Sequence, residues 1–155
     1  MRFNFEKLNV LVIGDFMMDT YIYGNSFRNS PEAPVPVIIP ERKISLVGGA
    51  GNVAMNLRSL GANVSCMGCI GSDELGTEMI DILESNDIQT SGLFQSKYKT
   101  ISKTRIFSND KQYLRIDVEE PFKDWRPPYE ENFDYTEFDI IILSDYNKGV
   151  FDKPW

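Results

Sequence analysis

Short apolar runs alternate along the chain with stretches whose apolar residues recur at helical spacing. The runs at residues 8–13, 64–70 and 139–143 are rich in β-branched residues and predict buried strands. The stretch after the glycine-rich segment 48–52 predicts a helix that stops at Gly61, and Ser72 is expected to cap a second helix. Strands that alternate with helices indicate an α/β fold with a parallel core sheet flanked by helices.

Other segments predict strands outside this core sheet. Three prolines within residues 31–36 exclude a helix and a central strand, but 35–39 and 43–47 can form edge strands around a turn near 40–42. Alternating patterns at 101–107 and 113–118, around a polar segment at 108–111, predict a hairpin. Alternation places Lys103 and Arg105 on one face of its first strand.

The composition is that of one ordinary globular domain, with 155 residues, 42% apolar and 25% charged. No apolar run reaches the roughly 18 residues that a membrane span needs. The first residues lack the apolar core and cleavage site of a signal peptide. We therefore expect a cytoplasmic protein with no membrane partner.

The net charge of −7 is distributed unevenly along the chain. Residues 117–139 hold nine acids and two bases, whereas residues 97–115 hold six bases and one acid. A single basic patch in an acidic protein argues against nucleic acid as a partner and is compatible with a small anion such as phosphate. A solvated strand face is the alternative interpretation of the same patch.

The chain contains no histidine and only two cysteines, Cys66 and Cys69. A zinc site has too few ligands here, and histidine general bases and Ser-His-Asp triads are excluded. Because both cysteines lie in an apolar run, we expect small buried thiols.

Candidate ligand-binding residues follow the predicted strands. Gly48 and Gly49 allow a close backbone approach, and Asn52 both donates and accepts hydrogen bonds, as sugar hydroxyls require. Asp15 and Asp19 follow the first predicted strand and Asp145 follows the last, where ligands bind in parallel sheets. A tight strand-to-helix turn and ordinary capping or surface acids are the structural alternatives.

These residues carry a resemblance to a known family. The segment 48–54, followed by Gly61 and Gly71, is similar to the N-terminal signature of the ribokinase/PfkB carbohydrate kinases, and Asp15 and Asp19 resemble the family's substrate-binding region. The resemblance implies a ribokinase-like fold, with residues 1–155 as its N-terminal, sugar-binding portion. A small β-sheet lid is expected at about 20–47 and 95–118, and a homodimer is expected to form through it.

Within that family the chain most resembles the heptose-7-phosphate kinases, which form the N-terminal half of a bifunctional protein of ADP-heptose synthesis for lipopolysaccharide cores. The segments 28–37, 103–105, 114–117 and 143–149 carry this narrower resemblance. It implies transfer of the ATP γ-phosphate to the anomeric hydroxyl of D-glycero-D-manno-heptose 7-phosphate. The sugar-binding residues would be Asp15, Gly48, Gly49 and Asn52; the candidates for the substrate phosphate are Arg28, Lys103, Arg105 and Arg115; and Asp19, Glu32, Asp145 and Lys148 complete the expected substrate-binding set.

One departure from the family concerns catalysis. The family's catalytic aspartate lies in a Gly-Ala-Gly-Asp motif that this sequence lacks, since its only Gly-Asp pair is Gly14–Asp15. We therefore expect no catalytic residue in this truncated chain and no activity of the chain alone. ATP and Mg²⁺ would serve the full-length family member without tight binding to this chain. The alternatives are a kinase for another sugar or sugar phosphate, and a non-catalytic sugar-binding or dimerisation module.

Overall fold

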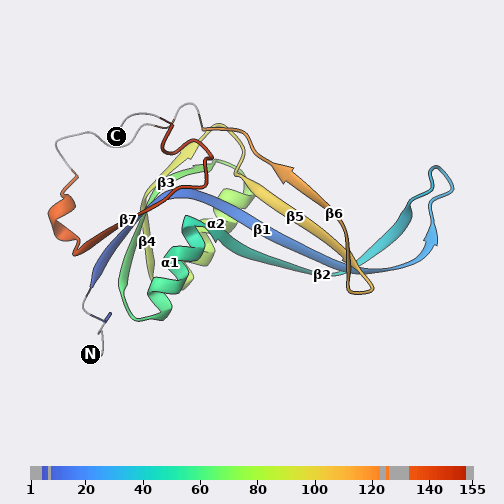
Figure 1. The fold of residues 1–155 in the computed structure, drawn as a ribbon, viewed down its shortest axis with the longest axis horizontal. Coiled ribbons are helices and arrows are strands. Elements are labelled where there is room, and N and C mark those ends of the chain that lie inside the picture. The colour runs from blue at the N-terminus through green and yellow to red at the C-terminus, as the bar shows by residue number, and fades with distance from the viewer. Residues whose placement is uncertain (1–4, 7, 123–124, 126–132, 153–155) are drawn as a thin grey trace.

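The computed structural model describes residues 5–6, 8–122, 125 and 133–152 (Figure 1). Two helices and a short 3₁₀ turn accompany seven strands in the described residues. They are β1 (Asn9–Asn29), β2 (Pro36–Gly49), α1 (Ala50–Ser59), β3 (Asn63–Gly71), α2 (Glu74–Ser85), β4 (Ile88–Ser96), β5 (Ser102–Ser108), β6 (Lys111–Val118), the 3₁₀ turn Tyr135–Glu137 and β7 (Ile140–Ser144). Neither helix is long and apolar enough to cross a membrane.

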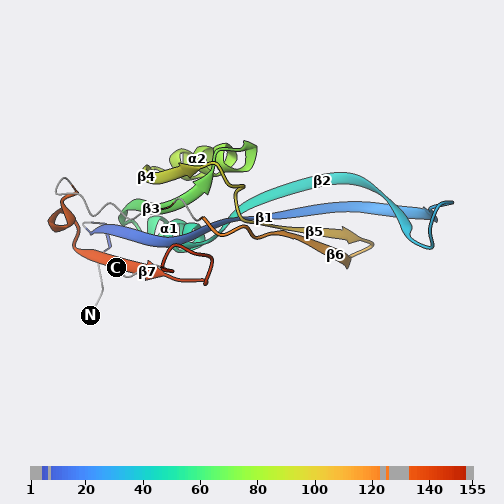
Figure 2. The ribbon, with the colours of Figure 1, turned by 90° about the horizontal axis from the view of Figure 1, so that it is seen from above.

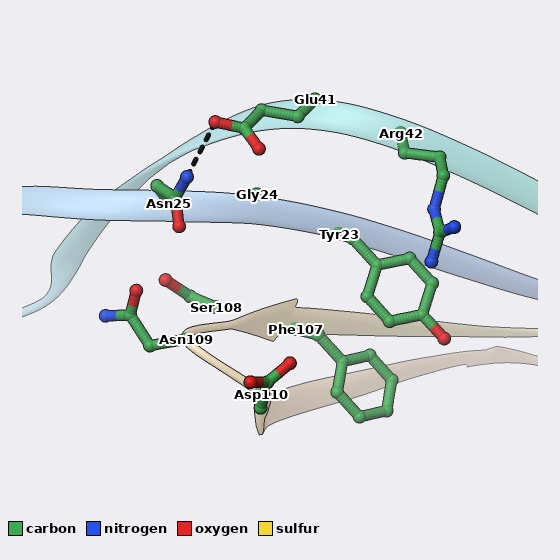
Figure 3. Close-up of a pocket in the computed structure, with 9 residues that line it drawn as sticks. All are labelled: Tyr23, Gly24, Asn25, Glu41, Arg42, Phe107, Ser108, Asn109 and Asp110. Carbon is green, nitrogen blue, oxygen red and sulfur yellow. Dashed lines mark hydrogen bonds between the residues drawn. The ribbon is translucent and has the colours of Figure 1, made fainter.

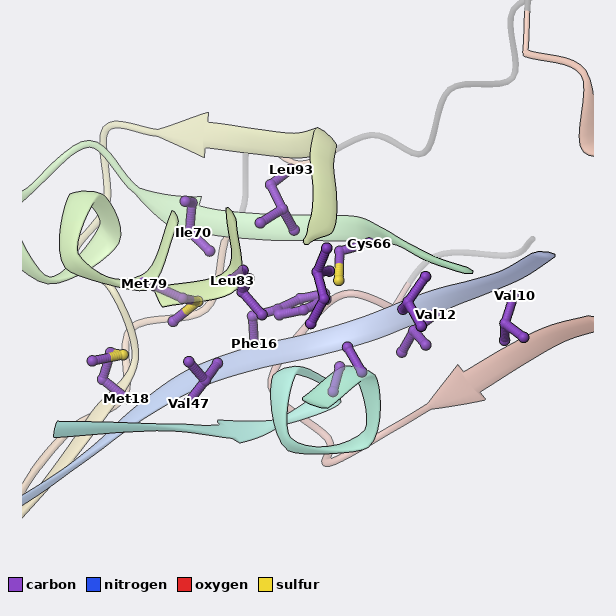
Figure 4. Packing of buried hydrophobic residues seen from close by; sticks show 14 of the residues in the cluster. Val10, Val12, Phe16, Met18, Val47, Cys66, Ile70, Met79, Leu83 and Leu93 are labelled. Atoms are coloured by element: carbon purple, nitrogen blue, oxygen red, sulfur yellow. The ribbon is translucent and has the colours of Figure 1, made fainter. Parts of the chain in front are cut away.

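A parallel core sheet with the strand order β4-β3-β1-β7 confirms the predicted α/β core (Figure 2). Side chains alternate between its two faces, so Val10 and Val12 point to one face and Leu11 and Ile13 to the other. Both helices pack on the first face, around Phe16 (Figure 4). The second face is covered by loop residues that include Phe122, Trp125 and Val150.

A second sheet, here called the outer sheet, extends away from the core (Figure 1). It consists of residues 16–29 of β1 together with β2, β5 and β6, in the order β2-β1-β5-β6. The predicted hairpin is confirmed as β5 and β6. The outer sheet occupies the segments where the family resemblance implies a lid.

Two expectations about the strands of the outer sheet are wrong. The first strand does not stop at Ile13, because β1 continues through Asp15 and joins both sheets. The segments 35–39 and 43–47 belong to one strand, and the expected turn at 40–42 is a bulge in which Tyr23 pairs with Arg42 and Gly24 with Pro40. The chain reverses instead at residues 30–35, within the proline-rich segment.

Local details also differ from the prediction. Asp73, not Ser72, caps α2, because its side chain accepts a hydrogen bond from the Gly76 N–H. The strand β4 was not predicted. The expected buried strand at 139–143 forms as β7, but it lies at a sheet edge and its Leu143 is 62% exposed. Part of the acidic segment 117–139 lies outside the described residues.

The two cysteines are buried thiols, as predicted. They project to opposite faces of the core sheet, Cys66 among the helix-side residues and Cys69 among those of the other face. Burial raises the pKa of the Cys66 thiol to about 12. A buried, protonated thiol is a packing residue and not a nucleophile.

Candidate functional site

The candidate site lies where β1 passes from the core sheet to the outer sheet. The pairing of β1 with β7 ends at Gly14, its pairing with β3 ends at Asp15, and its pairing with β2 begins at Phe16. The carboxyl ends of β3 and β7, the start of α1 and the base of the outer sheet therefore meet at one place (Figure 1). Parallel sheets bind ligands at such an edge.

At the two positions before α1, neighbouring atoms leave room only for glycine. A β-carbon at Gly48 would overlap the Asp19 carboxylate, and one at Gly49 would overlap the Asp15 carbonyl. Gly49 also has a φ of +57°, a left-handed conformation that glycine adopts without strain. No side chain caps α1, so the N–H groups of its first turn and the exposed Asn52 are available to a ligand.

The Asp15 carboxylate is engaged by the protein's own backbone, and its expected role in sugar binding stays a prediction. Asp15 is buried, and its carboxylate accepts hydrogen bonds from the backbone N–H groups of Tyr146 (2.8 Å), Lys148 (3.1 Å) and Val150 (3.1 Å). Asp15 anchors the loop after β7 to the core.

The charged residues of the outer sheet share one face. Asp19 of β1 lies beside Lys103 of β5, which lies beside Asp117 of β6. Residues paired in this way project their side chains to the same side of a sheet. We call this side, with the Glu119 and Lys148 side chains that reach it, the charged face; its members are Asp19, Lys103, Arg105, Arg115, Asp117, Glu119 and Lys148.

Every cation of the charged face is paired with a carboxylate. Lys103 contacts both Asp117, at 3.1 Å, and Glu119, and Lys148 contacts Glu119 at 3.0 Å. Two arginines complete the set, because Arg105 pairs with Asp19 and Arg115 pairs with Asp117 at 2.7 Å. Three of the six bases expected as a patch at 97–115, namely Lys103, Arg105 and Arg115, are therefore paired with acids from β1 and from the residues at and after the end of β6.

Hydrogen bonds hold this network in its charged form. The bonds from Lys103 and Lys148 lower the pKa of Glu119, and the bond to Glu119 raises the pKa of Lys103. The bond to Asp19 likewise raises the pKa of Arg105. Among the described residues, no three His, Cys, Asp or Glu side chains lie together as metal ligands, so we assign none.

The loop after β7 supplies the remaining predicted residues. Asp145 is exposed and accepts a hydrogen bond from the Asn147 N–H at 2.7 Å, which shapes the turn. Lys148 reaches back to Glu119, and its own N–H is held by Asp15. The loop therefore contributes one lysine to the charged face, while Asp145 has a local structural role.

Arg28 and Glu32 lie apart from the other predicted residues. Arg28 is near the end of β1, nine positions beyond Asp19, which corresponds to roughly 30 Å along an extended strand. Glu32 lies in the turn that follows, where its N–H donates to Ser30 Oγ. Within one chain, the structure does not bring either side chain to the charged face.

A cavity of about 480 Å³ lies at the far end of β5, beyond the charged face (Figure 3). Its walls include the stacked rings of Tyr23 and Phe107 and the hydrogen-bonded pair Asn25 and Glu41. The buried Ser108 hydroxyl has no hydrogen-bond partner among the described residues. None of the residues predicted from the sequence lines this cavity, so we do not place the site there.

The sequence interpretation missed two residues of the charged face, Asp117 and Glu119. Both belong to the acidic segment 117–139, which the charge count treats as separate from the basic residues 97–115. Yet Arg115, Asp117 and Glu119 are spaced by two, and this spacing places the first two on one side of β6 and directs Glu119 toward the same side. Strand alternation carried past Arg115 would have indicated them.

Comparisons with known proteins give consistent results. A model of the pfkB family carbohydrate kinases matches residues 7–145. The bifunctional protein HldE of Sulfurimonas denitrificans is 39% identical over 150 residues, and that of Helicobacter pylori is 44% identical over 149 residues. These matches cover 93% and 92% of this chain but only 31% and 32% of the relatives, so the chain spans about a third of their length.

Solved structures share the fold. A putative ribokinase from Agrobacterium tumefaciens superposes with a TM-score of 0.61 at 20% identity, over 88% of this chain and 44% of that one. The nucleoside kinase of Methanocaldococcus jannaschii, an archaeal member of the ribokinase family, also gives 0.61 at 20% identity, over 89% and 44%. At this identity the likeness establishes a ribokinase-like fold, present here in part.

Proposed function

Because the chain belongs to the pfkB family of carbohydrate kinases, we propose that it forms the sugar-binding part of a kinase that phosphorylates D-glycero-D-manno-heptose 7-phosphate at its anomeric hydroxyl. Three features support this substrate. They are the motif resemblance of segments 28–37, 103–105 and 143–149, the identity of about 40% to proteins named HldE, and the presence of cations beside the glycine-rich helix start.

The observation that carries the proposal is the proximity of two kinds of binding group. Asp19 lies directly over Gly48 and pairs with Arg105, so the start of α1 adjoins the charged face. Uncapped N–H groups and the Asn52 amide suit sugar hydroxyls, and lysine and arginine suit a phosphate. A ligand with both groups, a phosphorylated sugar, fits this arrangement better than a plain sugar does.

We assign the donor side of the reaction to residues beyond this chain. Family membership implies ATP and Mg²⁺ for a full-length kinase, and phosphoryl transfer depends on positioning and on neutralising the phosphate charges. In this proposal the described residues hold and orient the acceptor sugar. The chain by itself is expected not to transfer phosphate.

Titration calorimetry of the chain with heptose 7-phosphate tests this proposal. We expect saturable binding that Asn52→Ala and Arg105→Ala each weaken. Arg42→Ala is the matched control, because Arg42 lies farther along the outer sheet, over the Tyr23 ring, and lines the separate cavity of Figure 3. Indifference of binding to Asn52→Ala and Arg105→Ala, or equal weakening by Arg42→Ala, would reject the proposed site.

A homodimer through the outer sheet is a second proposal, and a specific observation favours it. The side of the outer sheet opposite the charged face carries Ile22, Ile106, Leu114 and Ile116. Leu114 and Ile116 are about half exposed. Adjacent exposed apolar side chains on one face are typical of a contact with another protein surface.

A further inference from the structure

Two lysines from distant parts of the chain converge on one carboxylate. Lys103 Nζ of β5 contacts Glu119 Oε1, and Lys148 Nζ of the loop after β7 contacts Glu119 Oε2 at 3.0 Å. Both lysine side chains are largely buried for this residue type, with 18% and 23% of their surface exposed. The Glu119 carboxylate is the anion that the two ammonium groups share.

Glu119 is also the acid of the charged face that can leave most easily. Its side chain is 36% exposed, against 21% for Asp19 and 25% for Asp117. Asp117 lies within β6 and is held by Arg115 as well as by Lys103, whereas Glu119 follows the last residue of β6. A rotation of the Glu119 side chain would free Lys148 and leave Lys103 with Asp117 alone, without disturbing a strand.

We propose that Glu119 is a built-in competitor for the substrate phosphate, occupying the seat between Lys103 and Lys148 that the phosphate takes on binding. This inference rests on the proposed function, which supplies a phosphorylated ligand. A phosphate near neutral pH carries more negative charge than a carboxylate and has three strong acceptor oxygens. It can therefore satisfy both lysines and displace Glu119.

The seat is anchored on both sides. Lys103 lies beside Asp19 in the register of β1 and β5, and the Lys148 N–H donates to buried Asp15 at 3.1 Å. The arginines are engaged elsewhere, Arg105 with Asp19 and the Tyr21 ring, and Arg115 with Asp117. A sugar without a phosphate cannot replace the charge of Glu119, so the competitor favours phosphorylated ligands.

The test compares Glu119→Gln with Glu120→Gln, which removes the same charge from the neighbouring exposed residue. Because an uncharged amide at position 119 would no longer hold two ammonium groups by charge, we expect Glu119→Gln to bind heptose 7-phosphate about fivefold more tightly than wild type. Affinity for the unphosphorylated heptose should not change. Glu120→Gln should match wild type, and Lys148→Met should abolish the gain when combined with Glu119→Gln.

Inorganic phosphate serves as a second probe that does not depend on the identity of the sugar. Equal or weaker binding of inorganic phosphate by Glu119→Gln, relative to Glu120→Gln, would overturn the inference whichever sugar the site takes. If Glu119→Gln binds inorganic phosphate more tightly but the wild-type chain does not bind heptose 7-phosphate, the role of Glu119 is supported and the proposed substrate is rejected. A loss of affinity for both the phosphorylated and the unphosphorylated heptose would make Glu119 a sugar ligand and also overturn the inference.

Discussion

Asp73 ties the start of α2 to the segment that leads into β5. Its carboxylate accepts hydrogen bonds from the Gly76 N–H (2.9 Å), the Thr100 N–H (3.0 Å) and the Thr100 hydroxyl (2.6 Å). Thr100 Oγ1 in turn accepts from the Gly71 N–H at 3.0 Å. One side chain therefore joins the β3–α2 connection to the base of the outer sheet, and we predict that Asp73→Ala is strongly destabilising.

The magnitude follows from these three bonds. Loss of the helix cap costs about 1 kcal/mol. Each bond to Thr100, which is buried, contributes about 1 kcal/mol more. The expected loss in the free energy of unfolding is therefore about 3 kcal/mol, a large share of the total stability of a small domain. Ser72→Ala, at the exposed neighbouring position that sequence alone suggests as the cap, should change it by less than about 0.5 kcal/mol.

The loss in the free energy of unfolding caused by Asp73→Ala should also depend on pH. Burial disfavours the charged form of Asp73, but the hydrogen bonds from Thr100 and Gly76 outweigh it and lower the pKa of Asp73. A carboxyl with a lowered folded pKa stabilises the protein fully above its unfolded pKa of about 4. That contribution fades as the pH falls through the folded pKa, so the gap between wild type and Asp73→Ala should narrow in acid.

Urea unfolding followed by circular dichroism at pH 7 and pH 3 measures both effects. The reasoning predicts a much lower unfolding midpoint for Asp73→Ala than for Ser72→Ala at pH 7, and a smaller difference at pH 3. Equal midpoints for the two variants at pH 7 would refute the assignment of Asp73 as the cap and tie.

Three further predictions concern other parts of the molecule. Gly48→Ala should weaken heptose 7-phosphate binding in calorimetry, because the added β-carbon displaces the Asp19 carboxylate from Arg105; unchanged affinity would argue against the close approach. Ile116→Glu should shift the chain toward monomer in sedimentation equilibrium, since Ile116 is 50% exposed on the apolar face of the outer sheet, and a wild type that is monomeric throughout would rule out that contact. Leu143→Lys should lower the binding of an apolar fluorescent dye with little change in unfolding midpoint, because Leu143 is exposed at the edge strand β7.

The sequence predicts the core better than the outer sheet, for a physical reason. Residues 64–70, apart from the partly buried Ser65, are buried on both faces of the sheet, so their apolar run is typical of a core strand. Beyond Thr20, most residues of β1 are only partly buried or exposed, and polar and aromatic residues are as compatible with a strand there as with a loop. The continuous pairing of β1 with β2 is a tertiary property that local pattern does not reveal.

The residues of the candidate site show the same contrast between features that local sequence reveals and features that only the tertiary structure reveals. Gly48 and Gly49 can be recognised from the sequence because a backbone constraint appears directly as a residue type, whereas the binding role of Asn52 stays a prediction. The contacts of Asp15 cannot be recognised in this way, because its partners are backbone N–H groups more than 130 positions away, which carry no residue signature. A local charge sum likewise finds the bases of residues 97–115 but not the carboxylates that neighbouring strands place beside them.

Asp15 and Asp19 lie on the same strand, and this explains why replacing the Glu119 carboxylate by a ligand phosphate would affect the whole site. Asp15 fixes the loop that carries Lys148 to the core, and Asp19 fixes Arg105 beside the start of α1. Lys103 belongs to the outer sheet, so any anion held between Lys103 and Lys148 ties the base of the outer sheet to the core. Exchange of the Glu119 carboxylate for a ligand phosphate preserves that tie while it fills the seat. Under the proposed function, binding of the phosphorylated sugar would therefore proceed without opening the junction between the two sheets. The four-residue step from Asp15 to Asp19, about 13 Å of extended strand, would set the distance between the loop that carries Lys148 and the position of Arg105.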